Sequence, residues 1–135
     1  IKLSPNTMVV VDSERIDRVI SNLIYNALKF TPRGGTVTVS YGLAETEAPT
    51  KPPTLVVCVR DTGSGISAED LPYVFDRFYK APRARSNAPG SGLGLSIARE
   101  IVRCHHGDIR IINAPQGQGT LARVRLPTHN KDSGR

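Results

Sequence analysis

The sequence has no tryptophan and few other aromatic residues, with three Phe and four Tyr among 135 residues. Its Lys and Arg residues give a net charge of +6 but are scattered along the chain. Because base stacking needs aromatic side chains interleaved with clustered basic ones, nucleic-acid binding is not predicted. No run approaches the ~20 apolar residues of a membrane span. No signal peptide or initiating Met precedes Ile1, so we expect a fragment of a longer protein.

Cysteine is scarce as well, and the two that occur are far apart. Cys58 lies in an apolar run and Cys104 near the end of a predicted helix, without any CxxC pair. This pattern excludes a disulfide framework and a cysteine-based zinc site, and it predicts two reduced thiols. The length suits one hydrophobic core and a single domain.

The hydrophobic periodicity predicts an alternation of strands and two long helices. Asp12-Ser13 is a typical helix cap, and Gly107 is suited to a left-handed cap at the end of the second helix. The predicted elements are strand 8–11, helix 15–31, a hairpin of strands 36–41 and 55–60 around the polar loop 44–53, short helical turns within 67–78, helix 92–106, and strands 108–113 and 120–126.

Polar side chains form a stripe on the first predicted helix. Asn22, Asn26 and Lys29 are spaced i, i+4 and i+7, which places them together beside the apolar face. An Asn oxygen is a neutral ligand that suits a Mg²⁺ ion already holding waters and phosphate oxygens, and a Lys one turn later can neutralise a phosphate. A solvated helix face would have the same pattern, so the neighbouring motifs must decide.

An acidic residue followed by glycines ends the predicted strand 55–60. In Asp61-Thr62-Gly63-Ser64-Gly65 the carboxylate can accept a hydrogen bond from the exocyclic amine that distinguishes adenine from guanine. Gly63 and Gly65 would let the backbone approach a flat base or turn sharply. Taken alone, the pattern is equally typical of an ordinary turn.

A glycine-rich segment, Gly90-Ser91-Gly92-Leu93-Gly94-Leu95, opens the second predicted helix. Its amides and the positive end of the helix dipole favour a phosphate chain. No Val/Ile-rich strand leads into it, and the Walker Lys-Ser/Thr is absent. The dinucleotide-binding and P-loop interpretations therefore both fail.

Taken together and in this order, the motifs at 22–31, 61–66, 75–80 and 90–95 resemble the N, first glycine, F and second glycine boxes of the catalytic ATP-binding domain of two-component sensor histidine kinases. Residues 117–120 resemble the last glycine box, and the resemblance covers 8–127. It implies a Bergerat fold, an α/β two-layer sandwich with a mixed, mostly antiparallel sheet covered by helices on one face. We expect one domain over 1–127, an ATP lid at 81–91, and a polar, disordered tail at 128–135.

The resemblance also implies roles for individual residues. Asn26 would be the Mg²⁺ ligand and would act in catalysis together with Lys29. Asp61 would hold the adenine amine, with Thr120 assisting through a water. The ATP-binding residues that the resemblance implies are Asn22, Asn26, Lys29, Phe30, Asp61, Gly63, Gly65, Ile66, Tyr79, Lys80, Gly90, Gly92, Leu93, Gly94, Leu95 and Thr120.

The implied function is transfer of the ATP γ-phosphoryl group to a His on a separate helical dimerisation domain of the same parent protein. The implied parent is a homodimer with a response regulator downstream, and this domain is expected to be monomeric and cytoplasmic. Whether the parent is anchored in the membrane stays open. Asn22 stands where hydrolases of this fold have a Glu that activates water, so efficient ATP hydrolysis is not expected. The sequence holds no His-bearing helical segment of the implied kind, so we expect it to bind ATP without phosphorylating itself.

Two other functions remain compatible with the sequence: an anti-sigma-type serine kinase and a non-catalytic ATP-sensing module of the same fold. The adjacent His105 and His106 could suggest a metal site or a phosphoacceptor. A His near a helix C-terminus also favours the helix dipole, however, and resembles the family's His-Gly helix ending. That second interpretation is the prediction.

Overall fold

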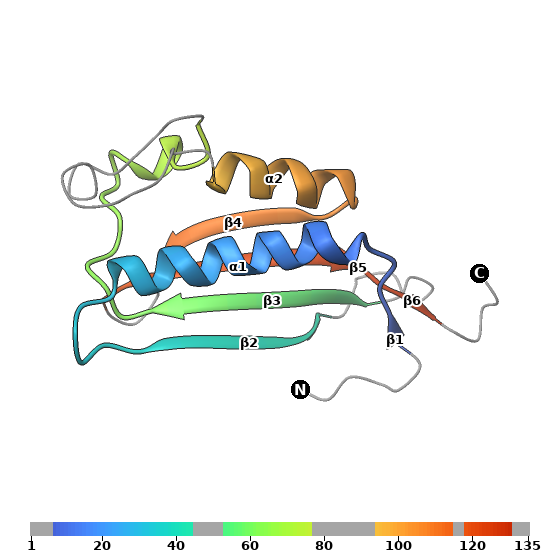
Figure 1. Cartoon of the computed structure of the whole chain (residues 1–135), viewed down its shortest axis with the longest axis horizontal. Helices are drawn as coiled ribbons and strands as arrows, with labels where there is room; N and C mark the ends of the chain where they lie inside the picture. The colour runs from blue at the N-terminus through green and yellow to red at the C-terminus, as the bar shows by residue number, and fades with distance from the viewer. Residues whose placement is uncertain (1–6, 45–52, 77–93, 115–117, 131–135) are drawn as a thin grey trace.

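The computed structural model describes residues 7–44, 53–76, 94–114 and 118–130, which form a sheet with two helices on one of its faces (Figure 1). The elements are β1 (Thr7–Met8), α1 (Ser13–Phe30), β2 (Val37–Ala44), β3 (Thr54–Asp61), the 3-10 turn η1 (Leu71–Tyr73), α2 (Gly94–Cys104), β4 (Asp108–Asn113), β5 (Thr120–Pro127) and β6 (His129–Asn130).

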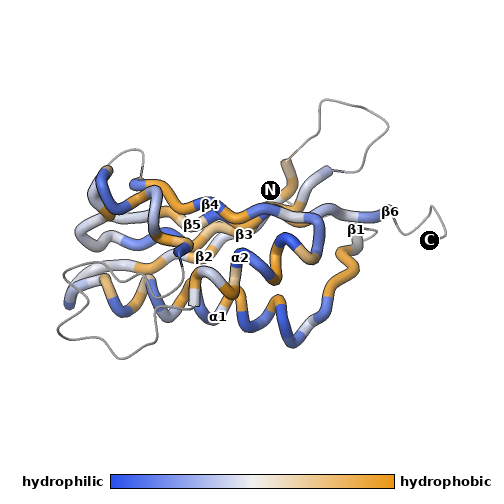
Figure 2. Tube along the Cα trace, turned by 90° about the horizontal axis from the view of Figure 1, so that it is seen from above, coloured by the Kyte–Doolittle hydropathy of each residue, from blue (hydrophilic) through white to orange (hydrophobic). Residues whose placement is uncertain are grey.

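The main sheet has four strands in the order β2-β3-β5-β4, and each neighbouring pair is antiparallel. The predicted hairpin is confirmed by the pairing of β2 with β3, in which Val37 lies opposite Asp61. Figure 2 shows α1 and α2 on the same side of this sheet. The predicted two-layer sandwich is therefore confirmed.

The core lies between the helices and the covered face of the sheet. Because side chains alternate along a strand, every second residue of β3 and β5 points toward the helices. The buried apolar residues of this core are Val19, Leu23, Ala27, Val59, Ala98, Ile101, Val102, Ile109, Ala122, Val124 and Leu126.

Helix α1 begins at Ser13, two residues before the predicted start, because Asp12 caps it. The Asp12 carboxylate Oδ1 accepts a hydrogen bond from the Arg15 backbone N–H at 3.2 Å. At the other end the Thr31 hydroxyl donates to the Ala27 carbonyl at 2.6 Å, and Pro32 follows. Both ends of the helix are thus fixed by the local sequence.

The end of α2 corrects the predicted role of Gly107. The residue in the left-handed conformation is His106, with φ 63°, and not Gly107. The N–H of Gly107 bonds to the Val102 carbonyl and the N–H of His106 to the Arg103 carbonyl, both at 3.0 Å, which is a Schellman motif. The glycine is required for another reason, because a Cβ at Gly107 would lie 2.0 Å from the Arg125 carbonyl oxygen.

The first strand is shorter than predicted. Strand β1 covers only Thr7–Met8, whereas the apolar run of Met8 and three valines predicted a strand over 8–11. Val9 and Val11 do pack against the core and Val10 is exposed, but no strand among the described residues pairs with them. An apolar run therefore predicts contact with the core, but burial alone does not supply a hydrogen-bonding partner for the backbone.

The predicted disordered tail is wrong for its first three residues. Strand β6 (His129–Asn130) pairs with β1, so that Thr7 lies opposite Asn130. Thr128 is buried, and its hydroxyl donates a hydrogen bond to the Pro53 carbonyl. Residues 7–8 and 129–130 are thus held by each other, a contact that a polar composition does not reveal. Residues 131–135 lie outside the described part.

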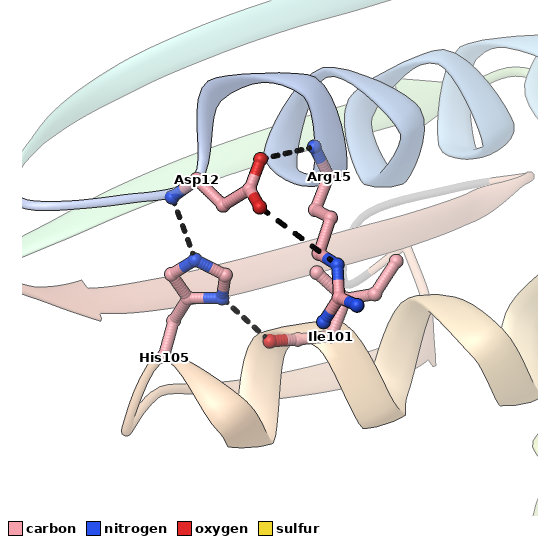
Figure 3. A network of polar contacts seen from close by, with 4 residues as sticks. All are labelled: Asp12, Arg15, Ile101 and His105. Atoms are coloured by element: carbon pink, nitrogen blue, oxygen red, sulfur yellow. Dashed lines mark hydrogen bonds and ion pairs between the residues drawn. The ribbon is translucent and has the colours of Figure 1, made fainter.

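His105 joins the two helices at this end of the molecule (Figure 3). Its Nε2 accepts a hydrogen bond from the Asp12 N–H at 2.9 Å, and its Nδ1 lies 2.7 Å from the Ile101 carbonyl oxygen. A carbonyl can only accept, so Nδ1 is the donor in this contact and Nε2 the acceptor from Asp12. These two contacts give His105 a structural role between the helices. Among the described residues no group of three or more His, Cys, Asp or Glu could hold a metal ion.

Candidate functional site

The last residue of β3, Asp61, is a buried carboxylate with only 6% of its surface exposed. Its Oδ1 accepts hydrogen bonds from the Gly63 N–H at 2.9 Å and the Thr120 N–H at 3.2 Å. Thr120 therefore contacts Asp61 directly through its backbone N–H. The contact through a water that the resemblance implied for Thr120 stays a prediction. Within the described residues Oδ2 accepts no hydrogen bond. A buried carboxylate fixed on one oxygen can accept a further hydrogen bond from a ligand on the other.

Two glycines allow the backbone to close around Asp61. Gly119 has φ 117°, and a Cβ there would lie 1.9 Å from the Asp61 carbonyl oxygen. A Cβ at Gly63 would lie 2.4 Å from the Phe30 carbonyl oxygen, at the end of α1. We refer to Asp61, Gly63, Gly119 and Thr120 as the aspartate corner. It forms where β3, β5 and the end of α1 meet, and any side chain at either glycine would push these elements apart.

Asn113 supports the loop that follows the aspartate corner, and the sequence interpretation missed it. Its Oδ1 accepts from the Ile66 N–H and its Nδ2 donates to the Ile66 carbonyl, both at 2.8 Å. Gly65, with φ 77°, lies against this contact, since a Cβ there would be 2.9 Å from the Asn113 Oδ1. The two residues are 47 positions apart, and only the polar end of the predicted strand 108–113 could have suggested a role.

A shallow hollow of about 500 Å³ lies beside this loop. It shares Gly119 with the aspartate corner but includes neither Asp61 nor the polar stripe of α1. Its lining residues are Ser64, Gly65, Ile66, Ser67, Asn113, Gln118 and Gly119.

The polar stripe of α1 lies on the flank of the helix that faces α2. The Asn22 Nδ2 donates to the Gly94 carbonyl at 3.4 Å, which joins α1 to the start of α2. Asn26 is half-buried, and its side-chain amide has no hydrogen-bond partner in the part of the chain that the structure describes. The Lys29 ammonium lies 5.4 Å from the Phe30 ring centre and 5.9 Å from that of Tyr25. The stripe is therefore more than a solvated face, because two of its members contact specific neighbours.

The segments on either side of the undescribed stretch 77–93 also meet. The Phe75 ring packs against the core, and the Arg99 guanidinium of α2 lies 5.0 Å from its centre. This contact places the residues before the stretch against the helix that follows it. Polar groups from α1, α2, β3 and β5 thus border one end of the sheet.

Residues 11–130 match the histidine kinase-, DNA gyrase B-, and HSP90-like ATPases. The chain belongs to this ATPase family. The predicted family is confirmed, and with it the assignment of an ATP-binding catalytic domain.

Relatives of this ATPase domain occur in sensor histidine kinases. It is 47% identical over 117 residues to the signal transduction histidine-protein kinase AfsQ2 of Streptomyces coelicolor, which covers 87% of this chain and 20% of that protein. It is 42% identical over 120 residues to the sensor histidine kinase WalK of Bacillus subtilis, covering 88% of this chain and 19% of that protein. The chain thus spans about a fifth of the length of these relatives.

Solved structures of sensor histidine kinases share the fold of this ATPase domain. The mycobacterial sensor histidine kinase MprB has a TM-score of 0.78 at 34% identity, covering 90% of this chain and 78% of that one. The catalytic domain of histidine kinase ThkA has a TM-score of 0.69 at 28% identity, covering 88% and 70%. These relatives do not favour the serine-kinase or sensing alternatives.

The structure describes part of the set of residues that the resemblance implied, and its hydrogen bonds join Asn22 to Gly94 and Asp61 to Gly63 and Thr120. The predicted residues that the structure describes are Asn22, Asn26, Lys29, Phe30, Asp61, Gly63, Gly65, Ile66, Gly94, Leu95 and Thr120. Tyr79, Lys80, Gly90, Gly92, Leu93 and the predicted lid 81–91 lie outside the described residues. None of the described helices is long and apolar enough to cross a membrane.

Proposed function

We propose that this domain binds ATP with the adenine amine on Asp61. The observation that carries the proposal is the aspartate corner: the carboxylate is buried and held through Oδ1 by two backbone N–H groups. A carboxylate fixed in this way discriminates strongly, because a base that places an acceptor opposite it leaves two buried acceptors facing each other. Adenine offers a donor at that position and guanine a carbonyl oxygen.

The phosphates belong, in this proposal, between the α1 stripe and the start of α2. Asn26 fits a Mg²⁺ ligand because its half-buried amide has no other partner among the described residues. No preformed acidic cage for a metal ion exists in that part of the chain, which suits an ion held mainly by phosphate oxygens and water. When bound, Mg²⁺ would supply charge neutralisation to the phosphates. Lys29, Lys80, Gly90, Gly92, Leu93, Gly94 and Leu95 are proposed as further phosphate contacts, and Tyr79 and Phe30 as neighbours of the nucleotide.

The reaction we propose is transfer of the γ-phosphoryl group to a histidine on a separate helical dimerisation domain of the parent protein. Such a transfer depends mostly on positioning and charge stabilisation, so this chain need not contain a general base. Asn22 cannot act as one, and its amide is engaged with Gly94. In this proposal the parent is a homodimer that passes the phosphoryl group to a response regulator, and the domain is cytoplasmic and monomeric alone.

Nucleotide titration tests the binding part of the proposal. We expect ATP to bind and GTP not to bind. Asp61→Asn should weaken ATP binding by at least about tenfold, which corresponds to a lost charge-assisted hydrogen bond. The matched control is Asp17→Asn, because Asp17 is exposed on α1 and should leave the affinity unchanged. Equal affinities of wild type and Asp61→Asn for ATP would refute the proposed role of Asp61.

Magnesium dependence tests the proposed metal ligand. Titrations of wild type and Asn26→Ala with and without Mg²⁺ should show that Mg²⁺ strengthens ATP binding only in wild type. An Asn26→Ala variant with the full Mg²⁺ dependence would assign the metal to another residue.

Supplying the acceptor tests the transfer itself. The domain is mixed with a histidine-bearing helical dimerisation domain and labelled ATP, and the product is exposed to acid. Acid-labile label on the added domain is the expected result. Acid-stable label would indicate a serine kinase, and ATP binding without any transfer would indicate a sensing module.

A further inference from the structure

The face of the sheet opposite the helices carries a group of arginines that the proposed function does not use. Of the described helices, α1 and α2 both cover the same face, and none covers the other (Figure 2). We call this second face the open face. Since alternate residues of β3 and β5 point to the core, the residues between them point outward. The open face includes the side chains of Thr38, Ser40, Val56, Cys58, Arg60, Asp108, Arg110, Ile112, Leu121, Arg123 and Arg125.

Four arginines lie next to one another on the open face. Arg110 of β4 is directly opposite Arg123 of β5. Arg125 is two residues further along the same strand, and Arg60 of β3 lies opposite Leu121, diagonal to Arg123. The positive charges therefore sit on three adjacent strands, at spacings of about 5 Å between strands and about 7 Å along a strand.

This arrangement costs stability in the isolated domain. Like charges directly opposite each other in a sheet repel, and Arg110 and Arg123 form such a pair. Asp108, opposite Arg125, is the acidic side chain that the pairing brings to this face. Among the described residues none of the four guanidinium groups forms an ion pair. A cluster of unpaired arginines with a repulsive pair at its centre is better explained by a negatively charged partner than by folding.

Apolar side chains separate the arginines. Val56, Cys58 and Leu121 are partly exposed there, and Ile112 is 37% exposed. Arginine combined with aliphatic surface is typical of protein interfaces, because the guanidinium is weakly hydrated and its stem covers apolar area. The face therefore suits a partner with both carboxylates and apolar side chains.

We propose that the open face is the docking surface for an acidic amphipathic helix of a partner protein. Neighbouring side chains on a helix surface, three or four residues apart, are separated by about 5–6 Å, which matches the spacing of the arginines. Each carboxylate at these positions can form a bidentate pair with one guanidinium group. The apolar residues of the helix then cover Val56 and Leu121. The helix would form a third layer, on the side of the sheet opposite α1 and α2.

The same observations disfavour a membrane or a nucleic acid as the partner. A sheet of this kind twists by roughly 20–25° from strand to strand, so the arginines of three strands do not lie in one plane as a bilayer surface would require. No aromatic side chain of the open face is available to stack on bases, since the exposed Tyr41 belongs to the set facing the helices. A helix can follow the twist, and it supplies the apolar contacts as well.

The test uses a synthetic helical peptide with glutamates at i, i+4 and i+7 beside a leucine stripe, and a second peptide with glutamine in place of glutamate. Fluorescence anisotropy measures binding to the whole chain at near-physiological salt. The open-face variant is Arg110→Gln with Arg123→Gln. The control is Arg18→Gln with Arg103→Gln, which removes the same charge from exposed positions on α1 and α2.

We expect the glutamate peptide to bind, and the open-face variant to weaken it by about tenfold or more, as two charge-assisted contacts are lost. The control should change binding by less than about twofold, since it changes only net charge and these positions are on the other layer. The open-face variant should unfold at the same temperature as wild type or slightly higher, because it removes a repulsion. Equal weakening in both variants, equal binding of the glutamine peptide, or no peptide binding would each overturn the proposal.

The two free cysteines give an independent readout. Cys58 is on the open face beside Arg123, and Cys104 is exposed on α2. Bound glutamate peptide should slow alkylation of Cys58 and leave Cys104 unchanged. Protection of Cys104 instead would place the peptide on the helical layer and overturn the proposal. Protection of Cys58 by phosphatidylserine vesicles or by duplex DNA, without protection by the peptide, would also overturn the proposal.

Discussion

The polar groups at the two ends of the four-stranded sheet differ in how completely they are hydrogen-bonded within the chain. At the end where β3 finishes, Asp61 is held through Oδ1 by two backbone N–H groups, and Oδ2 accepts no hydrogen bond from the described residues. At the opposite end, both ring nitrogens of His105 are bonded, the Asp12 carboxylate caps α1, and the Thr128 hydroxyl is bonded to Pro53. The far end is thus closed by contacts within the chain, while the aspartate corner keeps an oxygen for a ligand.

The difference teaches which contacts serve stability and which serve binding. A polar group whose hydrogen bonds are all made within the chain contributes to folding stability only. A buried acceptor without a donor lowers the stability of the folded state, and a ligand that donates to it can offset that cost. Substitutions at the far end should therefore change stability alone. Substitutions at the aspartate corner should change nucleotide affinity as well.

The largest effects should come from the glycine at each end. An added Cβ would lie 1.9 Å from the Asp61 carbonyl oxygen in Gly119→Ala and 2.0 Å from the Arg125 carbonyl oxygen in Gly107→Ala. We expect each to lower the free energy of unfolding by about 3 kcal/mol, with Gly119→Ala the larger because φ there is 117°. Denaturant unfolding measures this. Nucleotide titration of the folded protein should show weakened binding only in Gly119→Ala.

A third glycine, Gly34, separates the effect of steric overlap of an added Cβ from the effect of backbone strain. Gly34 has φ 89° but nothing within 4 Å of an added Cβ. Gly34→Ala should therefore cost only the conformational penalty, about 1–2 kcal/mol. If Gly34→Ala were as damaging as Gly119→Ala, steric overlap with Asp61 would not be the cause.

The second effect concerns Asn113, which ties β4 to the loop after the aspartate corner. Asn113→Ala removes two hydrogen bonds to Ile66 and should cost about 1–2 kcal/mol. Asn113→Asp keeps the acceptor for the Ile66 N–H but loses the donor. Hydrogen exchange of the Ile66 amide should therefore be fastest in Asn113→Ala and intermediate in Asn113→Asp, with ATP affinity reduced in the same order. An unchanged exchange rate of the Ile66 amide in Asn113→Ala would show that the loop keeps its conformation without the Asn113 contacts.

Asn113 also shows where sequence reasoning stops. The cap at Asp12, the paired strands β2 and β3 and the position of Asp61 at a strand end were predictable, because each depends on neighbours in sequence or on a repeating pattern. The partner of Asn113 is 47 residues away and that of His105 is 93. Such pairs depend on how the elements pack, and a single sequence contains no record of that.

The same limit explains the prediction at the end of α2. A His-Gly pair after a helix predicts a left-handed residue, and glycine is the usual choice. His106 takes that conformation because Gly107 is needed beside β5, where only a residue without a Cβ avoids the Arg125 carbonyl. The requirement for Gly107 comes from β5, about twenty residues later in the chain.

The third effect tests whether the far end is purely structural. His105→Ala removes the bonds to the Asp12 N–H and the Ile101 carbonyl and should lower the free energy of unfolding by about 1 kcal/mol, since these contacts are partly exposed. ATP affinity should stay at the wild-type value. A loss of affinity in His105→Ala would mean that the two ends are coupled through α1 and α2, against the division drawn above.

The smallest effect has the opposite sign and lies one residue away. His106 is exposed with φ 63°, a conformation that costs a residue with a Cβ roughly 1 kcal/mol relative to glycine. His106→Gly should therefore raise the free energy of unfolding by about 0.5–1 kcal/mol, less the extra chain entropy of glycine in the unfolded state. Chemical denaturation of His105→Ala, His106→Gly and the double variant measures both terms together. The His105 bonds and the His106 backbone conformation are separate contributions, so the stability of the double variant should fall between those of the two single variants. A double variant no more stable than His105→Ala would show that the helix end unwinds once the contact with Asp12 is lost.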